Sequence, residues 1–153
     1  MDTAASEPEA ESLGVHDCWR YLRSTSICRI AFVHTGKVEI FPVNYVPSNG
    51  TLLVRTGGGT KLDAVKERTA VSLEADGLNQ YGTIAWSVVV KGHAAEVHDA
   101  EEFQDAADAG LSPWQAGPKN SLIRITPEEI TGRRFVIAPP NSWWAPQEPA
   151  DRA

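Results

Sequence analysis

The segment ICRIAFVHTGKVEIFPVNYVPSNGTLLVRT, residues 27–56, contains three strand-like runs joined by two short turn signals. Apolar and β-branched residues dominate the runs, and the turn signals are HTGK at residues 34–37 and SNG at residues 48–50. Turns this short join antiparallel strands, because a parallel crossover needs about a dozen residues or more. The segment therefore predicts an antiparallel sheet and argues against a doubly wound parallel fold.

Strand-like runs continue along the rest of the chain, at residues 69–76, 83–99 and 121–137. The last run reads as a sixth strand followed by a short terminal strand, and Gly92 marks a bulge or a close approach of backbone. Helical spacing predicts three short helices, within residues 14–25, 60–68 and 100–110. Many strands with few helices indicate a mainly β protein built as an antiparallel barrel.

Length and charge limit the class of protein. The chain has 153 residues, a net charge of -6 and a pI of about 5.2, which fits one domain and disfavours nucleic-acid or anionic-membrane partners. Cys18 and Cys28 form no CxxC pair, so we expect buried thiols in a reducing compartment. No secretory signal or membrane-spanning apolar run is evident, which predicts a cytoplasmic protein.

Three segments are expected from composition. Residues 1–12 form an acidic leader that we expect to be disordered, residues 13–138 form the barrel domain, and residues 139–153 form a proline-containing tail. The tail carries Trp143 and Trp144, which we expect to dock on the body because paired aromatic side chains are unfavourable in water.

A glycine-rich loop lies in LLVRTGGGTKLDAV, residues 52–65, between a strand-like and a helix-like run. Backbone N–H groups in such loops, together with a cation such as Lys61, bind phosphate. Two familiar nucleotide motifs do not fit, because the loop matches neither the P-loop GxxxxGK(S/T) spacing nor the GxGxxG fingerprint. A flexible turn remains the simplest alternative for three consecutive glycines.

The order of several motifs resembles the flavin-binding split-barrel family related to pyridoxamine 5'-phosphate oxidase, in its small actinobacterial-type branch. The motifs are CRIAFV, FPVNYV, LLVRTGGGTKL, WSVVVKGHAAEV and SPWQAGPKNSLIRITPEEITGRRF, and the resemblance runs from about His16 to Phe135. It implies a six-stranded antiparallel split barrel that forms a homodimer, with flavin mononucleotide (FMN) at the dimer interface.

The resemblance also implies roles for particular residues. Thr60 and Lys61 would meet the flavin phosphate, and Arg29 lies on a strand that the family uses near it. The remaining implied cofactor contacts are Pro42, Val43 and Asn44 along the ring, Arg55 and Thr56 beside the ribityl chain, and Trp86 and Ser87 from the fifth strand, with Trp114 and Lys119 as possible second-subunit contacts. Without the resemblance, Arg29 could be an exposed edge residue, Asn44 a turn residue, and Trp86 or Trp114 a core or interface aromatic.

Two function classes remain open. One is a flavin-dependent oxidoreductase acting on a small molecule, and the other is a binding or carrier module for flavin, deazaflavin or haem. The acidic net charge and the single lysine of the loop favour FMN over a deazaflavin coenzyme. The longer substrate-binding C-terminal segment of the true oxidase is not matched, so the substrate is unassigned. His93 and His98 lie on opposite faces of one strand, and no metal site is predicted.

Overall fold

A computed structural model describes residues 10–56, 65, 68–111 and 121–137. These residues form seven β-strands and two α-helices. In chain order the elements are β1 (Glu11–Leu13), α1 (Val15–Leu22), β2 (Ile27–His34), β3 (Lys37–Ser48), β4 (Thr51–Thr56), β5 (Thr69–Leu78), β6 (Ile84–Val97), α2 (Ala100–Asp108) and β7 (Ser121–Val136). The expected helix within residues 60–68 lies almost wholly outside the described residues.

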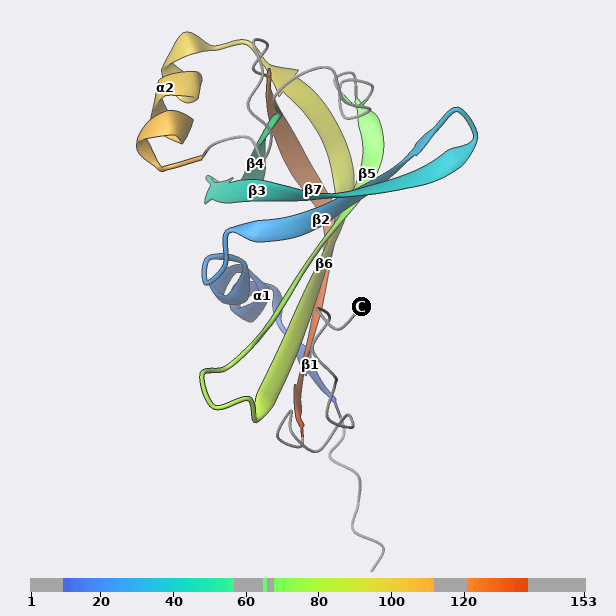
Figure 1. Cartoon of the computed structure of the whole chain (residues 1–153), viewed down its shortest axis with the longest axis vertical. Helices are drawn as coiled ribbons and strands as arrows, with labels where there is room; N and C mark the ends of the chain where they lie inside the picture. The colour runs from blue at the N-terminus through green and yellow to red at the C-terminus, as the bar shows by residue number, and fades with distance from the viewer. Residues whose placement is uncertain (1–9, 57–64, 66–67, 112–120, 138–153) are drawn as a thin grey trace, which may run out of the picture.

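The strands form one antiparallel sheet that curls into a barrel (Figure 1). The ring runs β7-β4-β3-β2-β5-β6, and a further pairing of β6 with β7 closes it. Strand β1 lies outside this ring, on the edge of β7. The predicted mainly β fold, a six-stranded antiparallel split barrel, is thus confirmed.

Strand β7 is one continuous strand, so the predicted division of residues 121–137 into two strands was wrong. Pro127 is the residue of this run that fits a strand least readily, because proline cannot donate to a strand ladder. The structure accommodates it opposite Gly92, where the β6–β7 register shifts. A Cβ atom on Gly92 would lie 2.0 Å from the carbonyl oxygen of Thr126. The predicted close approach at Gly92 is therefore confirmed.

The two hairpin turns of the opening segment have the expected tight geometry. Thr35 and Gly36 have φ angles of 49° and 75°, and Asn49 and Gly50 have φ angles of 47° and 75°. Positive φ at both central residues is typical of the turns that match the twist of paired strands. The turns place β2, β3 and β4 side by side in the sheet.

Alternate residues of each strand fill the barrel. In β2, Cys28, Ile30 and Phe32 are buried, whereas Ile27, Arg29, Ala31 and Val33 face outward, as the period-two pattern predicts. Both cysteines are free and buried, and burial raises the pKa of the Cys28 thiol. The fully buried side chains of the core include Leu22, Ile30, Leu52, Val54, Leu73, Val88, Val90, Ile123 and Ile125.

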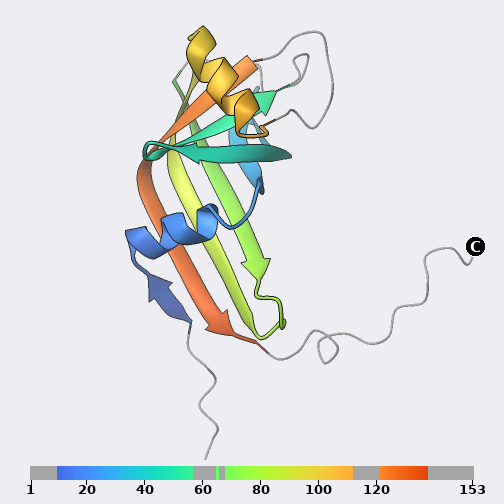
Figure 2. The ribbon, with the colours of Figure 1, turned by 90° about the vertical axis from the view of Figure 1, so that its left-hand side faces the viewer.

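Helix α1 packs across the lower part of the sheet (Figure 2) and buries Cys18 and Leu22. The hydroxyl of Tyr45 donates a 2.5 Å hydrogen bond to the carbonyl oxygen of Leu22, which ties β3 to the last turn of α1. Helix α2 begins at Asp99, whose carboxylate accepts from the backbone N–H of Glu101, and ends before Gly110 with a φ of 83°. Neither helix of the described residues has the length and apolar character that crossing a bilayer requires.

Strand β1 begins inside the segment expected to be a disordered leader. Glu11 pairs with Arg134 and Ser12 with Arg133, and the Glu11 carboxylate lies 2.6 Å from the Arg134 guanidinium. The expected boundary after residue 12 is therefore too late by two residues. The edge of β7 offers unpaired backbone N–H and C=O groups to which residues 11–13 hydrogen-bond. The acidic composition of the leader gives no sign of this pairing.

Candidate functional site

The outer face of β2 and β3 brings three of the expected cofactor residues together. Arg29 lies directly opposite Pro42, and Ile27 lies directly opposite Asn44. Residues directly opposite each other in antiparallel strands share a face, so Arg29, Pro42 and Asn44 form one outward surface. The Val43 side chain points the other way and is 4% exposed, so only its backbone borders this surface.

The end of β4 carries two buried polar atoms that lack a partner. Within the described residues, no hydrogen bond reaches Arg55 Nε or Thr56 Oγ1. Arg55 Nη1 donates to the carbonyl oxygen of Leu111 at 3.2 Å, and Thr56 is 3% exposed beside Ser121. A buried polar group without a partner is unfavourable by about 1–3 kcal/mol, and such groups are rare in folded proteins. The two side chains point to opposite faces of β4, with Arg55 toward Leu111 and Thr56 toward the barrel interior. Each could donate a hydrogen bond to an oxygen-rich ligand at the end of β4, where the glycine-rich loop follows in the chain.

Four expected residues fall outside the described residues. Thr60 and Lys61 belong to the glycine-rich loop that follows Thr56, and Trp114 and Lys119 belong to the segment before β7. Trp143 and Trp144 of the tail lie outside as well. Their roles therefore stay predictions.

Trp86 lies in the core, not on the cofactor face. It is 7% exposed and stacks on Tyr21 of α1, with ring centroids 4.9 Å apart. Gly77 leaves room for the indole, since a Cβ atom there would lie 2.9 Å from Trp86 Nε1. Trp86 and Ser87 were expected to face the cofactor together, but neighbouring strand residues point to opposite faces. The core alternative for Trp86 is the correct one.

Ser87 faces outward in a row of side chains that crosses four strands. Arg133 of β7 lies between two partners, directly opposite Ser12 of β1 on one side and Ser87 of β6 on the other. Ser87 in turn lies directly opposite Asp76 of β5. Ser12, Ser87 and Arg133 line a pocket of about 510 Å³. Sequence reasoning missed Arg133. Its place opposite Ser87 depends on the register between β6 and β7, which becomes known only when β7 is seen to be continuous. The guanidinium and two hydroxyls can donate hydrogen bonds to an anionic group.

Arg29 is held by two carboxylates of β5. Its Nη1 atom lies 3.2 Å from Glu74 Oε2 and 2.9 Å from Asp76 Oδ2. Burial raises the pKa of Glu74 to about 7, assisted by the hydrogen bond and the negative charge of Asp76 and opposed by Arg29. Arg29 therefore lies centrally between β3 and β5, and the edge position considered for it was wrong.

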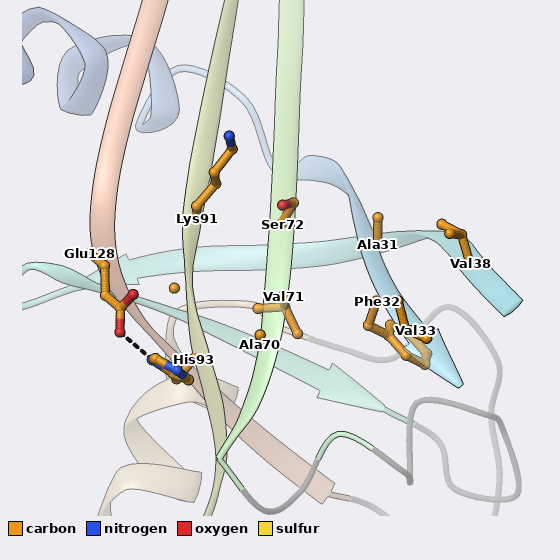
Figure 3. A pocket seen from close by; sticks show the side chains of 11 residues that line it. Ala31, Phe32, Val33, Val38, Ala70, Val71, Ser72, Lys91, His93 and Glu128 are labelled. Carbon is orange, nitrogen blue, oxygen red and sulfur yellow. Dashed lines mark ion pairs between the residues drawn. The ribbon is translucent and has the colours of Figure 1, made fainter. Parts of the chain in front are cut away.

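A second concave area lies on the outer face of β2, β5 and β6 (Figure 3). It has a volume of about 370 Å³, with Val33 and Val38 on one side and His93 on the other. The His93 Nδ1 atom pairs with the Glu128 carboxylate. Across the ranges the structure describes, no three His, Cys, Asp or Glu side chains are grouped as metal ligands.

Comparison with known proteins places the chain in a family. A family model described as pyridoxamine 5'-phosphate oxidase matches residues 15–134. The chain belongs to this family. A crystal structure of a family protein from Corynebacterium glutamicum, provisionally assigned as a pyridoxamine 5'-phosphate oxidase, has a TM-score of 0.73 and 33% identity, and covers 84% of this chain and 100% of that one.

Two further relatives come from mycobacteria. A flavin adenine dinucleotide (FAD) binding protein of Mycobacterium smegmatis has a TM-score of 0.69 and 36% identity, covering 82% of this chain and 98% of that chain. An uncharacterized protein of Mycobacterium tuberculosis is 32% identical over 136 residues, which cover 86% of this chain and 89% of the relative. The expected actinobacterial branch of the pyridoxamine 5'-phosphate oxidase family is thus confirmed.

Proposed function

We propose that the chain binds a flavin and acts as a flavin-dependent oxidoreductase on a small molecule. The observation that carries the proposal is the pair of buried, unpartnered atoms, Arg55 Nε and Thr56 Oγ1, beside the glycine-rich loop. The two side chains leave β4 on opposite faces, so we propose that different parts of a phosphorylated flavin, each with oxygen acceptors, meet them. The FAD-binding relative from M. smegmatis supports the cofactor class.

The proposed site has two areas, and each contacts a different part of the cofactor. Arg55, Thr56, Thr60 and Lys61 hold the phosphate and ribityl chain at the end of β4. Pro42 and Asn44 border the ring on the outer face of β3, beside Arg29. When bound, the flavin supplies two-electron hydride chemistry, and the protein supplies its position and electrostatic surroundings.

FMN is the flavin we propose, because one loop lysine and the net charge of -6 suit one terminal phosphate better than a longer anionic tail. FAD and a deazaflavin coenzyme are the alternatives to test. Purified apoprotein is titrated with each coenzyme, and FMN is expected to bind most tightly. If FAD or the deazaflavin coenzyme bound at least about tenfold more tightly than FMN, that coenzyme would be the proposed cofactor instead of FMN.

A homodimer with the cofactor at its interface is part of the proposal. The outer face of the β2–β3 hairpin carries large apolar side chains that are 43–75% exposed, namely Ile27, Val33, Val38 and Ile40. Apolar side chains gathered on one face mark an interaction surface. Trp114 and Lys119 are proposed to contact the partner's cofactor.

Anaerobic reduction separates the enzyme from a binding or carrier module. Flavin-loaded protein is mixed with NADH or NADPH, and the loss of flavin absorbance near 450 nm, typical of free flavins, is compared with free FMN at equal concentration. We expect the protein to accelerate reduction by about a hundredfold or more, as positioning alone permits. A rate equal to that of free FMN would favour the carrier function for these donors.

A further inference from the structure

Two neighbouring pockets beside β3 share the lining residues Arg23 and Pro47, and the two together are here called the Arg23 groove. The first has a volume of about 330 Å³ and is lined by Thr25, Ser26, Asn44 and the residues just after α2. The second, also about 330 Å³, is lined by His16, Trp19 and the β3–β4 turn at residues 48–50. Arg23 and Pro47 line both pockets. Figure 2 shows β3 passing between α1 and α2, and residues after α2 line the first pocket whereas residues of α1 line the second.

The charge of the groove differs from that of the whole chain. Arg23 is exposed and makes no ion pair with any described residue, whereas Arg20, one turn earlier, pairs with Asp17 at 3.3 Å. Neither pocket has an acidic side chain among its described lining residues. In a protein of net charge -6, an unpaired guanidinium beside the hydroxyls of Thr25 and Ser26 is suited to a phosphate group.

The second pocket offers flat surfaces for an aromatic base. Trp19 is half-buried: it packs partly against the core and lines the pocket together with His16 and Pro47. Stacking of a nucleobase on an aromatic side chain contributes about 1–3 kcal/mol. An aromatic surface next to a cation and hydroxyls is therefore the recognition pattern of a nucleotide.

The groove lies at the ring end of the proposed flavin site. Strand β4 runs antiparallel to β3, with Leu52 opposite Pro47 and Val54 opposite Tyr45. Thr56, the last residue of β4 before the glycine-rich loop in the sequence, therefore lies beyond Tyr45 on the side away from Pro47. Asn44 borders the groove and the proposed ring site alike. A nucleotide in the groove would thus approach the ring, not extend from the flavin phosphate.

We propose that the Arg23 groove binds the adenylate half of a nicotinamide dinucleotide, the hydride donor of the flavin. This inference rests on the proposed function. In this transfer the C4–H bond of the dihydronicotinamide would break, and the hydride, which is two electrons and one proton, would form a new N–H bond at N5 of the oxidised flavin. The nicotinamide becomes the aromatic pyridinium, and the flavin is reduced by the same two electrons.

The test uses ADP, which shares the adenylate chemistry of both nicotinamide dinucleotides and needs no bound flavin. Isothermal titration of the full chain is expected to show ADP binding that weakens about tenfold to a hundredfold in Arg23→Gln. Arg20→Gln is the matched control, because it removes the same charge at the same end of α1 from a residue that lines neither pocket. It should change the affinity by less than about twofold. Trp19→Leu should weaken both ADP and adenosine, whereas Arg23→Gln should leave adenosine unchanged.

Three results would overturn the assignment. The wild-type chain could fail to bind ADP, or Arg20→Gln and Arg23→Gln could weaken ADP equally. Alternatively, Arg23→Gln could weaken FAD without weakening FMN, which would place the adenylate of the cofactor in the groove. FMN titration of the same samples is independent of ADP binding. A chain that binds FMN but not ADP would therefore refute the groove and leave the proposed flavin site standing.

Discussion

Replacing Thr56 by Val should stabilise the protein without ligand and weaken its flavin affinity. The Thr56 hydroxyl is buried, with the residue 3% exposed, and has no hydrogen-bond partner among the described residues. Valine has nearly the same shape and no polar atom, so it removes the unsatisfied group. The hydroxyl would become favourable only when a flavin phosphate or ribityl oxygen meets it.

The size of both effects follows from the unsatisfied hydroxyl. An unpaired buried polar group is unfavourable by about 1–3 kcal/mol, so Thr56→Val should raise the free energy of unfolding by about 1 kcal/mol. For a chain of this size that corresponds to roughly 2–4 °C in Tm. Losing one hydrogen bond to a charged phosphate should lower FMN affinity by about tenfold.

The assay pairs thermal unfolding of the apoprotein with FMN titration followed by flavin fluorescence. Thr51→Val is the matched control in the same strand, because Thr51 Oγ1 already donates to the Ser48 carbonyl oxygen at 2.7 Å. That variant should lose about 1 kcal/mol of stability and keep its FMN affinity. If Thr56→Val destabilises the apoprotein like Thr51→Val, or leaves FMN affinity unchanged, the hydroxyl is not reserved for a ligand.

Three other predictions concern the fold, its pH dependence and its assembly. Gly92→Ala should destabilise the barrel by about 3 kcal/mol or more, measured by urea unfolding, because its Cβ would lie 2.0 Å from the Thr126 oxygen; a loss below 1 kcal/mol would contradict the close approach. The pKa of Glu74 is about 7 in the folded chain against a usual 4.5, so folding favours the protonated form and stability falls as pH rises between these values. Glu74→Gln should remove about 1 kcal/mol of this change in the free energy of unfolding, a figure that allows for the screening of Glu74 by solvent. An unchanged slope of stability against pH would exclude Glu74 as its source. Light scattering at micromolar concentration should give a dimer, and a monomer would count against the proposed interface.

The sequence predicted those parts of the fold that local pattern controls. The alternation of side chains along β2 correctly separated Cys28, Ile30 and Phe32 from the outward-facing residues. The glycines at residues 36 and 50 correctly marked the two hairpin turns. The continuous β7 could not be predicted, because Pro127 is accommodated where the β6–β7 register shifts, with Gly92 of β6 directly opposite it. Local sequence does not reveal which residue lies across the sheet.

The candidate site was predictable to a similar degree. The motifs identified the outer face of β3 and the end of β4, and the structure places Arg29, Pro42 and Asn44 together. Trp86 was misplaced because its stacking partner, Tyr21, lies on α1, far away in sequence. Likewise, the position of Arg133 opposite Ser87 depends on strand register.

The most direct test of the account compares FMN with riboflavin, which lacks the phosphate, in the wild-type chain and in Lys61→Ala. Flavin fluorescence gives the four dissociation constants. Lys61→Ala should lower FMN affinity about tenfold to a hundredfold, because it removes one charge-assisted contact to the phosphate, and should leave riboflavin affinity unchanged. An equal loss for both flavins, or no loss for either, would mean that the loop after β4 does not hold a flavin phosphate.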